Sequence, residues 1–414
     1  MESSAAYIAM LQSIYPRGTG RFTLGLERMR DLLGRLEHPE HHSKTIVVAG
    51  TNGKGSTSRF LEAALLEHGD SVGLFTSPHL LRFTERIRVN GEEITQDHAV
   101  SHYESIKLAC NELPTFFECI TAIAFLEFKR ANTKWRIMEV GLGGRLDATN
   151  VAQKCLTVIT PIDLDHQMYL GHSIEEIAQE KAGILEKGIP VVIAQQNVQA
   201  RSVIENRAQD LACPIIDASC TRICATALVN KHQLAAYQID NLATAMAAYQ
   251  TLTGDADETS NATMDRALHR YLNPGRYQWI DDRTLLDGAH NPAGAHALID
   301  ALAQDPRAQN RPISLILSSL HDKDIGEILR PWKTRAHEIH LCPCTSGRSR
   351  TSEELAKTAY KLGIKAKIHP SLHAALETTK HSPNNLVVIT GSLFLVADAL
   401  ALLCGIARDP PVDG

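Results

Sequence analysis

The segment from Thr45 to Thr57 constrains this chain most, because it joins a short apolar run to a glycine-rich turn and then to a helical pattern. It reads Thr45-Ile-Val-Val-Ala-Gly-Thr-Asn-Gly-Lys-Gly-Ser-Thr57. Glycines let backbone N–H groups close around phosphate oxygens, the following helix N-terminus adds a favourable dipole, and Lys54 adds a positive charge. We therefore predict a phosphate-binding loop between a buried strand and a helix over 58–67.

The loop departs from the common phosphate-loop pattern, which has a glycine five residues before the Gly-Lys pair and a Ser or Thr directly after the lysine. Val48 stands at the first position, and Gly55 separates Lys54 from Ser56. A glycine-rich segment also occurs in plain strand-to-helix turns, so the loop alone leaves that alternative open.

Short β-rich apolar runs alternate with helical patterns along the chain. A first series of runs lies at 45–49, 72–75, 136–140, 156–160 and 190–194. A second series lies at 284–286, 313–318, 338–341 and 386–390. This alternation is typical of βαβ units and predicts the α/β class with largely parallel sheets.

The two series indicate two domains. A chain of 414 residues exceeds what one hydrophobic core usually serves, and the turn-forming cluster Leu272-Asn-Pro-Gly-Arg276 lies between the series. We predict a P-loop ATPase-type N-terminal domain with a parallel sheet over residues 1–278, followed by a smaller Rossmann-like α/β domain over 279–414.

Composition and charge exclude several classes of protein. The net charge is −5, and no lysine- and arginine-rich stripe of the kind that follows a phosphate backbone is present. The first thirty residues lack a basic segment followed by an apolar run, and no stretch approaches the roughly 18 apolar residues of a membrane span. We expect a cytoplasmic protein with neither nucleic acid nor membrane as a partner.

The nine cysteines indicate reduced thiols rather than a disulfide framework, because their number is odd and no secretory signal precedes them. Cys342-Pro-Cys344 and the pair Cys220 and Cys224 lack a second pair or histidines at zinc-finger spacing. We predict no zinc site at these cysteines.

Two further polar clusters follow expected strands. In Met138-Glu-Val-Gly-Leu-Gly-Gly-Arg-Leu-Asp-Ala-Thr-Asn150 a strand delivers Glu139 beside the phosphate loop, where a Mg²⁺ ligand would lie. Ile162-Asp-Leu-Asp-His166 also follows a strand. Taken alone, Glu139 fits a capped or salt-bridged surface residue equally well, and His166 fits either a metal ligand or a hydrogen-bonded histidine.

Taken together, the motifs resemble those of one family in order and approximate spacing. They are the loop 50–56, Thr76-Ser-Pro-His-Leu80, the segment 139–150, Asp165-His166, Glu180-Lys-Ala-Gly-Ile184, Asn273-Pro-Gly-Arg276, Leu286-Asp-Gly-Ala-His-Asn-Pro292, His321-Asp-Lys-Asp324 and Thr390-Gly-Ser392. Over residues 24–396 the chain resembles the bacterial folylpolyglutamate synthase and dihydrofolate synthase family, a branch of the Mur-ligase-like enzymes. This resemblance implies a Mur-ligase-like ATP-binding domain with a folate site, followed by a ligase domain.

The resemblance also implies a binding site for ATP and Mg²⁺ between the domains. The implied ATP contacts are Gly53, Lys54, Gly55, Ser56, Asn241, Arg276, Asp287 and His290. The implied Mg²⁺ ligands are Ser77, Glu139 and His166. Without the resemblance, Arg276 also fits a linker charge and Asp287 a turn residue.

Lys181 matches the lysine that the family carries as a carbamate, a CO₂ adduct that turns a cation into an anion. From the residues alone it fits an exposed lysine on a helix over 174–185. The resemblance implies a catalytic role for three residues, Lys54, His166 and Lys181.

For the acceptor, the resemblance implies a dihydropteroate site formed by two segments. Its residues are Thr115, Phe116, Phe117, Glu118, Leu146, Asp147 and Ala148. Two adjacent phenylalanines are more often core residues than a stacking surface, so that alternative stays open.

The implied reaction is addition of L-glutamate to dihydropteroate, to reduced folates or to both, through an acyl phosphate formed from ATP. Such a reaction requires positioning and charge neutralisation rather than a Ser/His/Asp triad. The alternatives are a folate-only synthase, a Mur-type ligase with another acceptor, and a P-loop regulatory protein without ligase activity. We expect a monomer whose domains close on the substrates.

Overall fold

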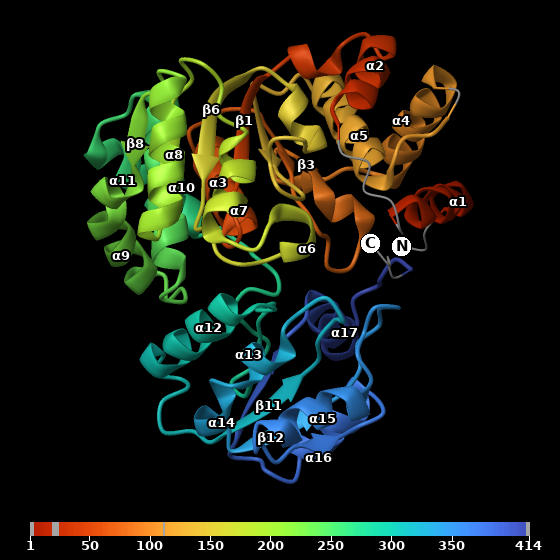
Figure 1. Cartoon of the computed structure of the whole chain (residues 1–414), viewed down its shortest axis with the longest axis vertical. Coiled ribbons are helices and arrows are strands. Elements are labelled where there is room, and N and C mark those ends of the chain that lie inside the picture. The colour runs from red at the N-terminus through yellow and green to blue at the C-terminus, as the bar shows by residue number, and fades with distance from the viewer. Residues whose placement is uncertain (1–3, 19–24, 111, 411–414) are drawn as a thin grey trace.

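The computed structural model describes residues 4–18, 25–110 and 112–410, which form a larger and a smaller α/β unit (Figure 1). Leu24, where the resemblance begins, lies outside these residues. The larger unit runs from red to green in Figure 1, and the smaller one from teal to blue. The prediction of an α/β protein with two largely parallel sheets is confirmed.

The larger unit contains an eight-stranded sheet in the order β4-β3-β2-β5-β1-β6-β7-β8. Its strands are β1 (Lys44–Ala49), β2 (Val72–Phe75), β3 (Ile87–Val89), β4 (Glu92–Glu93), β5 (Trp135–Glu139), β6 (Lys154–Ile159), β7 (Val191–Ile193) and β8 (Ile215–Asp217). Two pairs at one edge are antiparallel, β2 with β3 and β3 with β4. Strand β1 lies between β5 and β6, which explains its continuous apolar run.

Helices cover both faces of this sheet. They are α1 (Ala5–Ile14), α2 (Glu27–Arg35), α3 (Lys54–Glu67), α4 (Gln96–Ala109), α5 (Phe116–Arg130), α6 (Gln167–Leu170), α7 (Ile174–Ala182), α8 (Val198–Asp210), α9 (Arg222–Lys231), α10 (Gln238–Thr253) and α11 (Asp257–Leu268). Val47 and Ala49 point to one core, with α5, α7 and α8, whereas Ile46 and Val48 point to the other, with α3 and α10. This alternation is the two-residue period of a strand.

Short 3₁₀ helices connect several of these elements. They are η1 (Tyr15–Gly18), η2 (Pro39–His41), η3 (Phe83–Arg86), η4 (Ala148–Val151) and η5 (Ala218–Thr221). Two expected helix boundaries were wrong: α3 begins at Lys54, directly after the loop, and α7 ends at Ala182. The loop glycines therefore lead straight into a helix N-terminus, whose first N–H groups have no partner within the helix itself.

The smaller unit contains a six-stranded sheet in the order β13-β12-β11-β14-β10-β9. Its strands are β9 (Gln278–Trp279), β10 (Thr284–Leu286), β11 (Ile313–Leu317), β12 (Glu338–Leu341), β13 (Lys367–Ile368) and β14 (Leu386–Thr390). Its helices are α12 (Pro292–Gln304), α13 (Ile325–Leu329), α14 (Trp332–Arg335), α15 (Ser352–Lys361), α16 (Leu372–Thr379) and α17 (Leu393–Cys404). All strand pairs are parallel except that of β9 with β10.

The two units touch at several points besides the connecting chain. Asp409, after α17, is buried and accepts hydrogen bonds from the Tyr7 hydroxyl at 2.6 Å and the Phe83 N–H at 2.7 Å. Asn273, between the units, donates to the Ser56 hydroxyl at 2.9 Å. Within the described part of the chain, no helix combines the length and the apolar character that a membrane crossing requires.

Candidate active site

The loop after β1 adopts a conformation that excludes side chains. Gly53 has a φ of 84°, and a Cβ there would lie 2.1 Å from the Asn241 Oδ1 atom. Only glycine combines this left-handed backbone with such a close approach. The plain-turn alternative does not explain why the loop packs its backbone against α10 while the start of α3 faces a cavity.

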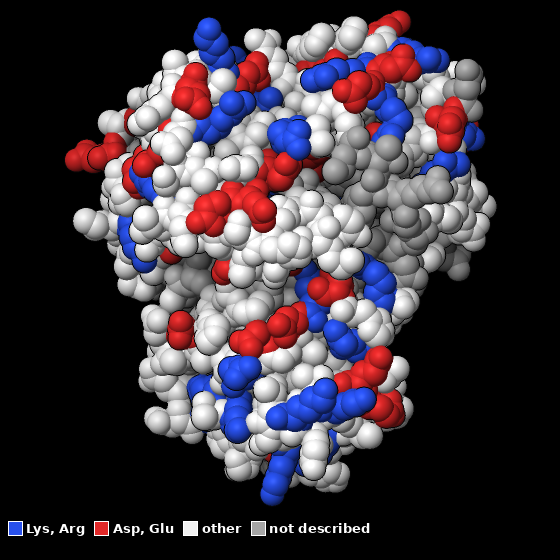
Figure 2. Space-filling model, in the orientation of Figure 1, with Lys and Arg blue, Asp and Glu red and all other residues white. Residues whose placement is uncertain are grey.

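A cavity of about 410 Å³ lies between the two units, and residues from both line it. Among them are all the residues implied to bind ATP or Mg²⁺ or to act in catalysis: Gly53, Lys54, Gly55, Ser56, Ser77, Glu139, His166, Lys181, Asn241, Arg276, Asp287 and His290. Figure 2 shows a groove between the units, with charges of both signs interspersed on this face. The cavity lies beyond the carboxyl ends of parallel strands, where α/β proteins bind ligands.

Two lysines point to one carbonyl of the loop. Lys54 Nζ donates to the oxygens of Gly50 at 3.0 Å and Thr51 at 3.1 Å. Lys181 Nζ, from α7, donates to the Gly50 oxygen at 2.8 Å. Burial, and then the charge of Lys54, lower the pKa of Lys181 to about 7. Lys181 is 5% exposed, so its interpretation as an exposed helix lysine is wrong.

Glu139 ends β5 inside the cavity rather than on the surface. It is 4% exposed, and its Oε2 accepts the Ser77 N–H at 3.0 Å. Burial raises the pKa of Glu139, whereas the Lys54 charge opposes that rise. The surface-carboxylate alternative for Glu139 is therefore wrong.

His166 lies on the wall of the same cavity, at the start of α6. It has a φ of 51°, its side chain is 40% exposed, and its Nε2 lies 4.0 Å from the Asp165 Oδ2. Desolvation in the cleft lowers the pKa of His166 to about 4, against the attraction of Asp165, so the imidazole is neutral at pH 7. Glu139 offers a carboxylate, Ser77 a hydroxyl and His166 a neutral imidazole. These donors suit a hard divalent cation whose remaining ligands are phosphate and water oxygens.

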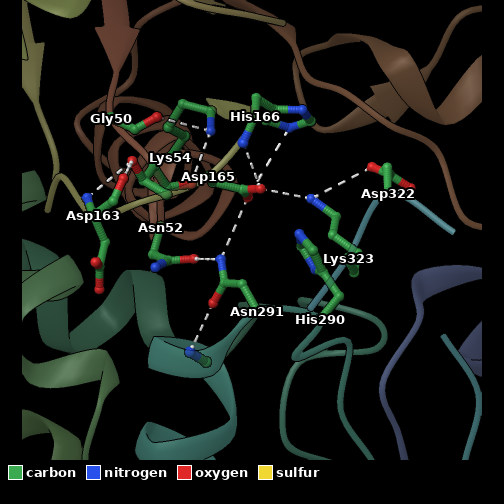
Figure 3. A network of polar contacts seen from close by, with 12 residues as sticks. Gly50, Asn52, Lys54, Asp163, Asp165, His166, His290, Asn291, Asp322 and Lys323 are labelled. Atoms are coloured by element: carbon green, nitrogen blue, oxygen red, sulfur yellow. Dashed lines mark hydrogen bonds and ion pairs between the residues drawn. The ribbon is translucent and has the colours of Figure 1, made fainter. Parts of the chain in front are cut away.

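A polar bridge joins the two units at the edge of the cavity (Figure 3). Asp165 accepts from Lys323 Nζ at 2.7 Å and from Asn291 Nδ2 at 3.5 Å, and Asn291 Nδ2 also donates to Asn52 Oδ1 at 2.9 Å. Burial alone would raise the pKa of Asp165. His166, which is protonated in the acidic range where Asp165 titrates, and the Lys323 ammonium lower this pKa below its ordinary value. Sequence analysis singled out the motifs that contain these residues but missed this pairing.

The smaller unit contributes Asp287 and His290 from the loop after β10. Asp287 is 3% exposed and accepts from the Tyr237 hydroxyl at 2.7 Å and the N–H groups of Tyr277 and Ala289, both at 2.8 Å. Burial raises the pKa of Asp287, with Arg276 opposing. His290 Nδ1 lies 2.9 Å from the Gly288 oxygen, and burial lowers its pKa to about 4. Neither the linker-charge interpretation of Arg276 nor the turn interpretation of Asp287 accounts for their place in the cavity.

The first acceptor segment begins α5 beside the cavity and is tightly bonded within the protein. Thr115 caps the helix, and Glu118 accepts from the Thr115 N–H at 2.9 Å and from Arg28 at 2.8 Å. Phe116 is buried under the Arg86 guanidinium, whereas Phe117 is half-buried and its ring contacts Gly141.

The second acceptor segment meets the first at Gly141, which lines the cavity. Asp147 accepts the N–H groups of Gly141 and Leu142, each at 3.0 Å, and Ala148 begins η4. Leu146 is half-buried. The structure therefore brings the two segments together next to the cavity, but does not place them in its lining.

Two family models match the chain: "Mur ligase middle domain" over residues 48–248 and "Mur ligase, glutamate ligase domain" over 275–393. A Bacillus subtilis protein named dihydrofolate synthase/folylpolyglutamate synthase is 34% identical over 408 residues, which cover 90% of this chain and 94% of that protein.

Solved structures of similar proteins share the fold of the whole chain. Escherichia coli FolC in complex with DHPP and ADP is 28% identical, with a TM-score of 0.84 over 98% of this chain and 99% of that one. A Yersinia pestis bifunctional folylpolyglutamate synthase/dihydrofolate synthase, complexed with AMPPNP and Mn ion, is 29% identical, with the same TM-score and coverage. This chain therefore belongs to the dihydrofolate synthase/folylpolyglutamate synthase family of Mur ligases and is an ATP-dependent ligase.

Proposed function

We propose that this enzyme adds L-glutamate both to dihydropteroate and to reduced folates. The observation that carries the proposal is a cavity lined by residues of both units, from Gly53 to His290. A regulatory P-loop protein would need the loop but not Glu139, His166 and Lys181 in the same cavity. The names of the relatives and the DHPP complex of a structural neighbour support a pterin-type acceptor.

The phosphate loop and Lys54 would bind the ATP phosphates. The start of α3 lines the cavity, and phosphate oxygens would replace the carbonyls of Gly50 and Thr51 as acceptors for Lys54 Nζ. Asn241, Arg276, Asp287 and His290 would contact the rest of the nucleotide from the other walls of the cavity, as expected of a ligand held between two units.

Ser77, Glu139 and His166 would hold Mg²⁺. Their donor atoms suit that ion, and the Mn complex of the Yersinia pestis neighbour supports a divalent metal at such a site. When bound, the ion neutralises charge on the phosphates. The Lys54 charge lies beside Glu139, which favours the ionised carboxylate that a metal ligand requires.

Lys181 would carry a carbamate, formed when its neutral amine adds to CO₂ and releases a proton. Carbamate formation requires a neutral amine, and a pKa near 7 provides a large neutral fraction at physiological pH. The carbamate would replace the ammonium group that donates to the Gly50 oxygen. Its negative charge would attract the Lys54 cation, which donates to the same oxygen.

The reaction would then proceed in two steps within the closed cavity. The γ-phosphoryl group of ATP passes to the acceptor carboxylate and forms an acyl phosphate, and the amine of glutamate attacks the acyl carbon and expels phosphate. The protein's part is to position two anions and to exclude water from the acyl phosphate.

The acceptor would enter beside Gly141, where the segments 115–118 and 146–148 meet. Phe117 and Leu146 would supply apolar surface for the pterin, because both are half-buried. The other residues of the two segments would line and support this surface, because hydrogen bonds fix the start of α5 and the start of η4. These residues are Thr115, Phe116, Glu118, Asp147 and Ala148.

Three further expectations stay predictions. A domain boundary near residue 278 is supported by α11, which ends at Leu268 in the first core, and by β9, which begins at Gln278 in the second sheet. We also expect a monomer and a cytoplasmic location.

Release of ADP, measured separately with dihydropteroate and tetrahydrofolate in the presence of glutamate, tests the function. We expect glutamate-dependent release with both acceptors. Activity with tetrahydrofolate alone would identify a folate-only synthase, and no activity with either would contradict the proposal.

A further inference from the structure

Two histidines and one carboxylate converge at the end of α2, far from the active site. His38 Nδ1 lies 2.9 Å and His41 Nε2 lies 3.4 Å from the same atom, Glu40 Oε1. The three donor atoms all lie within 4.8 Å of one another. The two imidazole rings are nearly parallel, with an interplanar angle of 5° and centroids 4.8 Å apart.

These separations are close to the edges of a coordination tetrahedron around a small ion. Zn²⁺ binds histidine nitrogen and carboxylate oxygen at about 2.0–2.2 Å, so ligand atoms on a regular tetrahedron lie roughly 3.3–3.6 Å apart. Of the two distances to Glu40 Oε1, 3.4 Å lies within that range and 2.9 Å lies below it. Two imidazoles and one carboxylate are ligands that Zn²⁺ accepts, whereas Mg²⁺ and Ca²⁺ favour oxygen.

The carboxylate of Glu40 is buried, and the charge of the nearby Arg136 acts on it without a hydrogen bond between the two side chains among the described residues. Glu40 is 7% exposed, and its Oε2 atom is buried with no hydrogen-bond partner in the described part of the chain. The nearby buried Arg136 guanidinium donates to backbone oxygens of Pro39, Glu40 and Ser43 rather than to this carboxylate. A buried acceptor without a partner is costly, and a metal ion on the same carboxylate would compensate for it.

Hydrogen bonds from other segments fix the backbone that carries the three side chains. Besides the bonds from Arg136, Lys129 donates to the Glu37 oxygen at 3.2 Å. Glu37 and His38 both have positive φ values, 60° and 50°, which turn the chain sharply after α2 and place His38 beside His41. Non-glycine residues adopt this conformation rarely, and the surrounding contacts hold it here.

We propose that His38, Glu40 and His41 form a binding site for a divalent transition ion, with Zn²⁺ the best fit and a fourth position open to water. The two histidines are exposed, so the ion can enter from solvent. In the metal-free chain at least one imidazole N–H donates to Oε1, and the ion takes the place of that proton.

The site is separate from the active centre. It precedes β1, whereas the phosphate loop follows this six-residue strand, so about 20 Å of strand lies between them at roughly 3.3 Å per residue. A second cluster, formed by His232, Asp265 and His269, is less suitable, because Lys231 Nζ lies 2.6 Å from Asp265 Oδ2 and competes with a cation.

Calorimetric titration of Zn²⁺ into the full-length chain tests the proposal, with His41→Asn and Glu40→Gln as the disrupting variants. The matched control is His42→Asn, because His42 is an exposed neighbour that contributes no ligand atom. We expect wild type and His42→Asn to bind one Zn²⁺ about tenfold or more tightly than the other two variants. Binding at cysteines would be common to all four proteins.

Equal isotherms in all four proteins, or the same loss in His42→Asn, would overturn the site. His41→Asn keeps the test valid if Glu40→Gln does not fold, because His41 is exposed. Anomalous diffraction at the zinc edge should then show a peak between His38, Glu40 and His41, and its absence would also overturn the proposal. Ligase activity of His41→Asn should equal that of wild type, which separates this site from the proposed function.

Discussion

Lys323 in the smaller unit holds its Nζ atom 2.7 Å from Asp165 Oδ1 in the larger one, and both side chains are largely buried. The bridge lies beside His166 and His290 at the edge of the cavity (Figure 3). It therefore ties the relative position of the two units to the geometry of the active site.

Lys323→Met should loosen the contact between the units, because it leaves the Asp165 carboxylate without its cation. We expect a larger radius of gyration by small-angle scattering and a loss of about 1–3 kcal/mol in the free energy of unfolding. Lys357→Met, at an exposed lysine in the same unit, is the control and should change neither quantity. An unchanged radius and an unchanged free energy would show that the bridge does not hold the units together.

Lys54→Ala should lower turnover by at least about 100-fold, because it removes a charge that would stabilise the phosphates during transfer. The fold should be retained, since the hydrogen bonds of Lys54 Nζ go to the carbonyls of Gly50 and Thr51 in its own loop, and circular dichroism would check this. Lys44→Ala, at the exposed opposite end of β1, is a control with ordinary turnover expected. Near-normal turnover in Lys54→Ala would contradict the role of the loop.

Lys181→Ala should impair turnover, and acetate or formate should restore part of it by placing a carboxylate in the space that the carbamate would occupy. Helix α7 should persist, because alanine is a good helix former. The measurement is the rate of ADP release with and without the added acid. Wild-type activity of the variant, or a crystal structure at high bicarbonate with a bare Lys181 ammonium, would count against the carbamate.

Lys181 should also make stability depend on pH when CO₂ is excluded. Its pKa is about 7 in the folded chain and about 10.4 when unfolded, so between these values the unfolded chain binds more protons and stability rises with pH. From pH 7 to pH 9 the free energy of unfolding of wild type should rise by roughly 2 kcal/mol more than that of Lys181→Met. Chemical denaturation measures this, with the exposed Lys187→Met as control. Parallel curves for wild type and Lys181→Met would mean that Lys181 has an ordinary pKa.

Local sequence patterns determined the elements that build the site. The apolar run before Gly50 predicted β1, and the glycines predicted the phosphate loop, because strand burial and left-handed turns depend on a few neighbouring residues. The resemblance then identified the residues that line the cavity. The start of α3 was predicted four residues too late, because the glycine-rich sequence around Lys54 does not indicate a helix that begins there.

Only the tertiary structure decided which side chains are buried and which are paired. Asp165 and Lys323 are 158 positions apart and meet because the two units come together around one cavity. Lys181 has the sequence pattern of a surface helix lysine, yet the packing of α7 against the glycine segment at Gly144 buries it on the Gly50 carbonyl. His38, Glu40 and His41 are close in sequence, but only the turn after α2, supported by the buried Arg136, brings their donor atoms together. Sequence periodicity specifies which residues form strands and helices. Burial and charge pairing depend on how elements far apart in the sequence pack against one another.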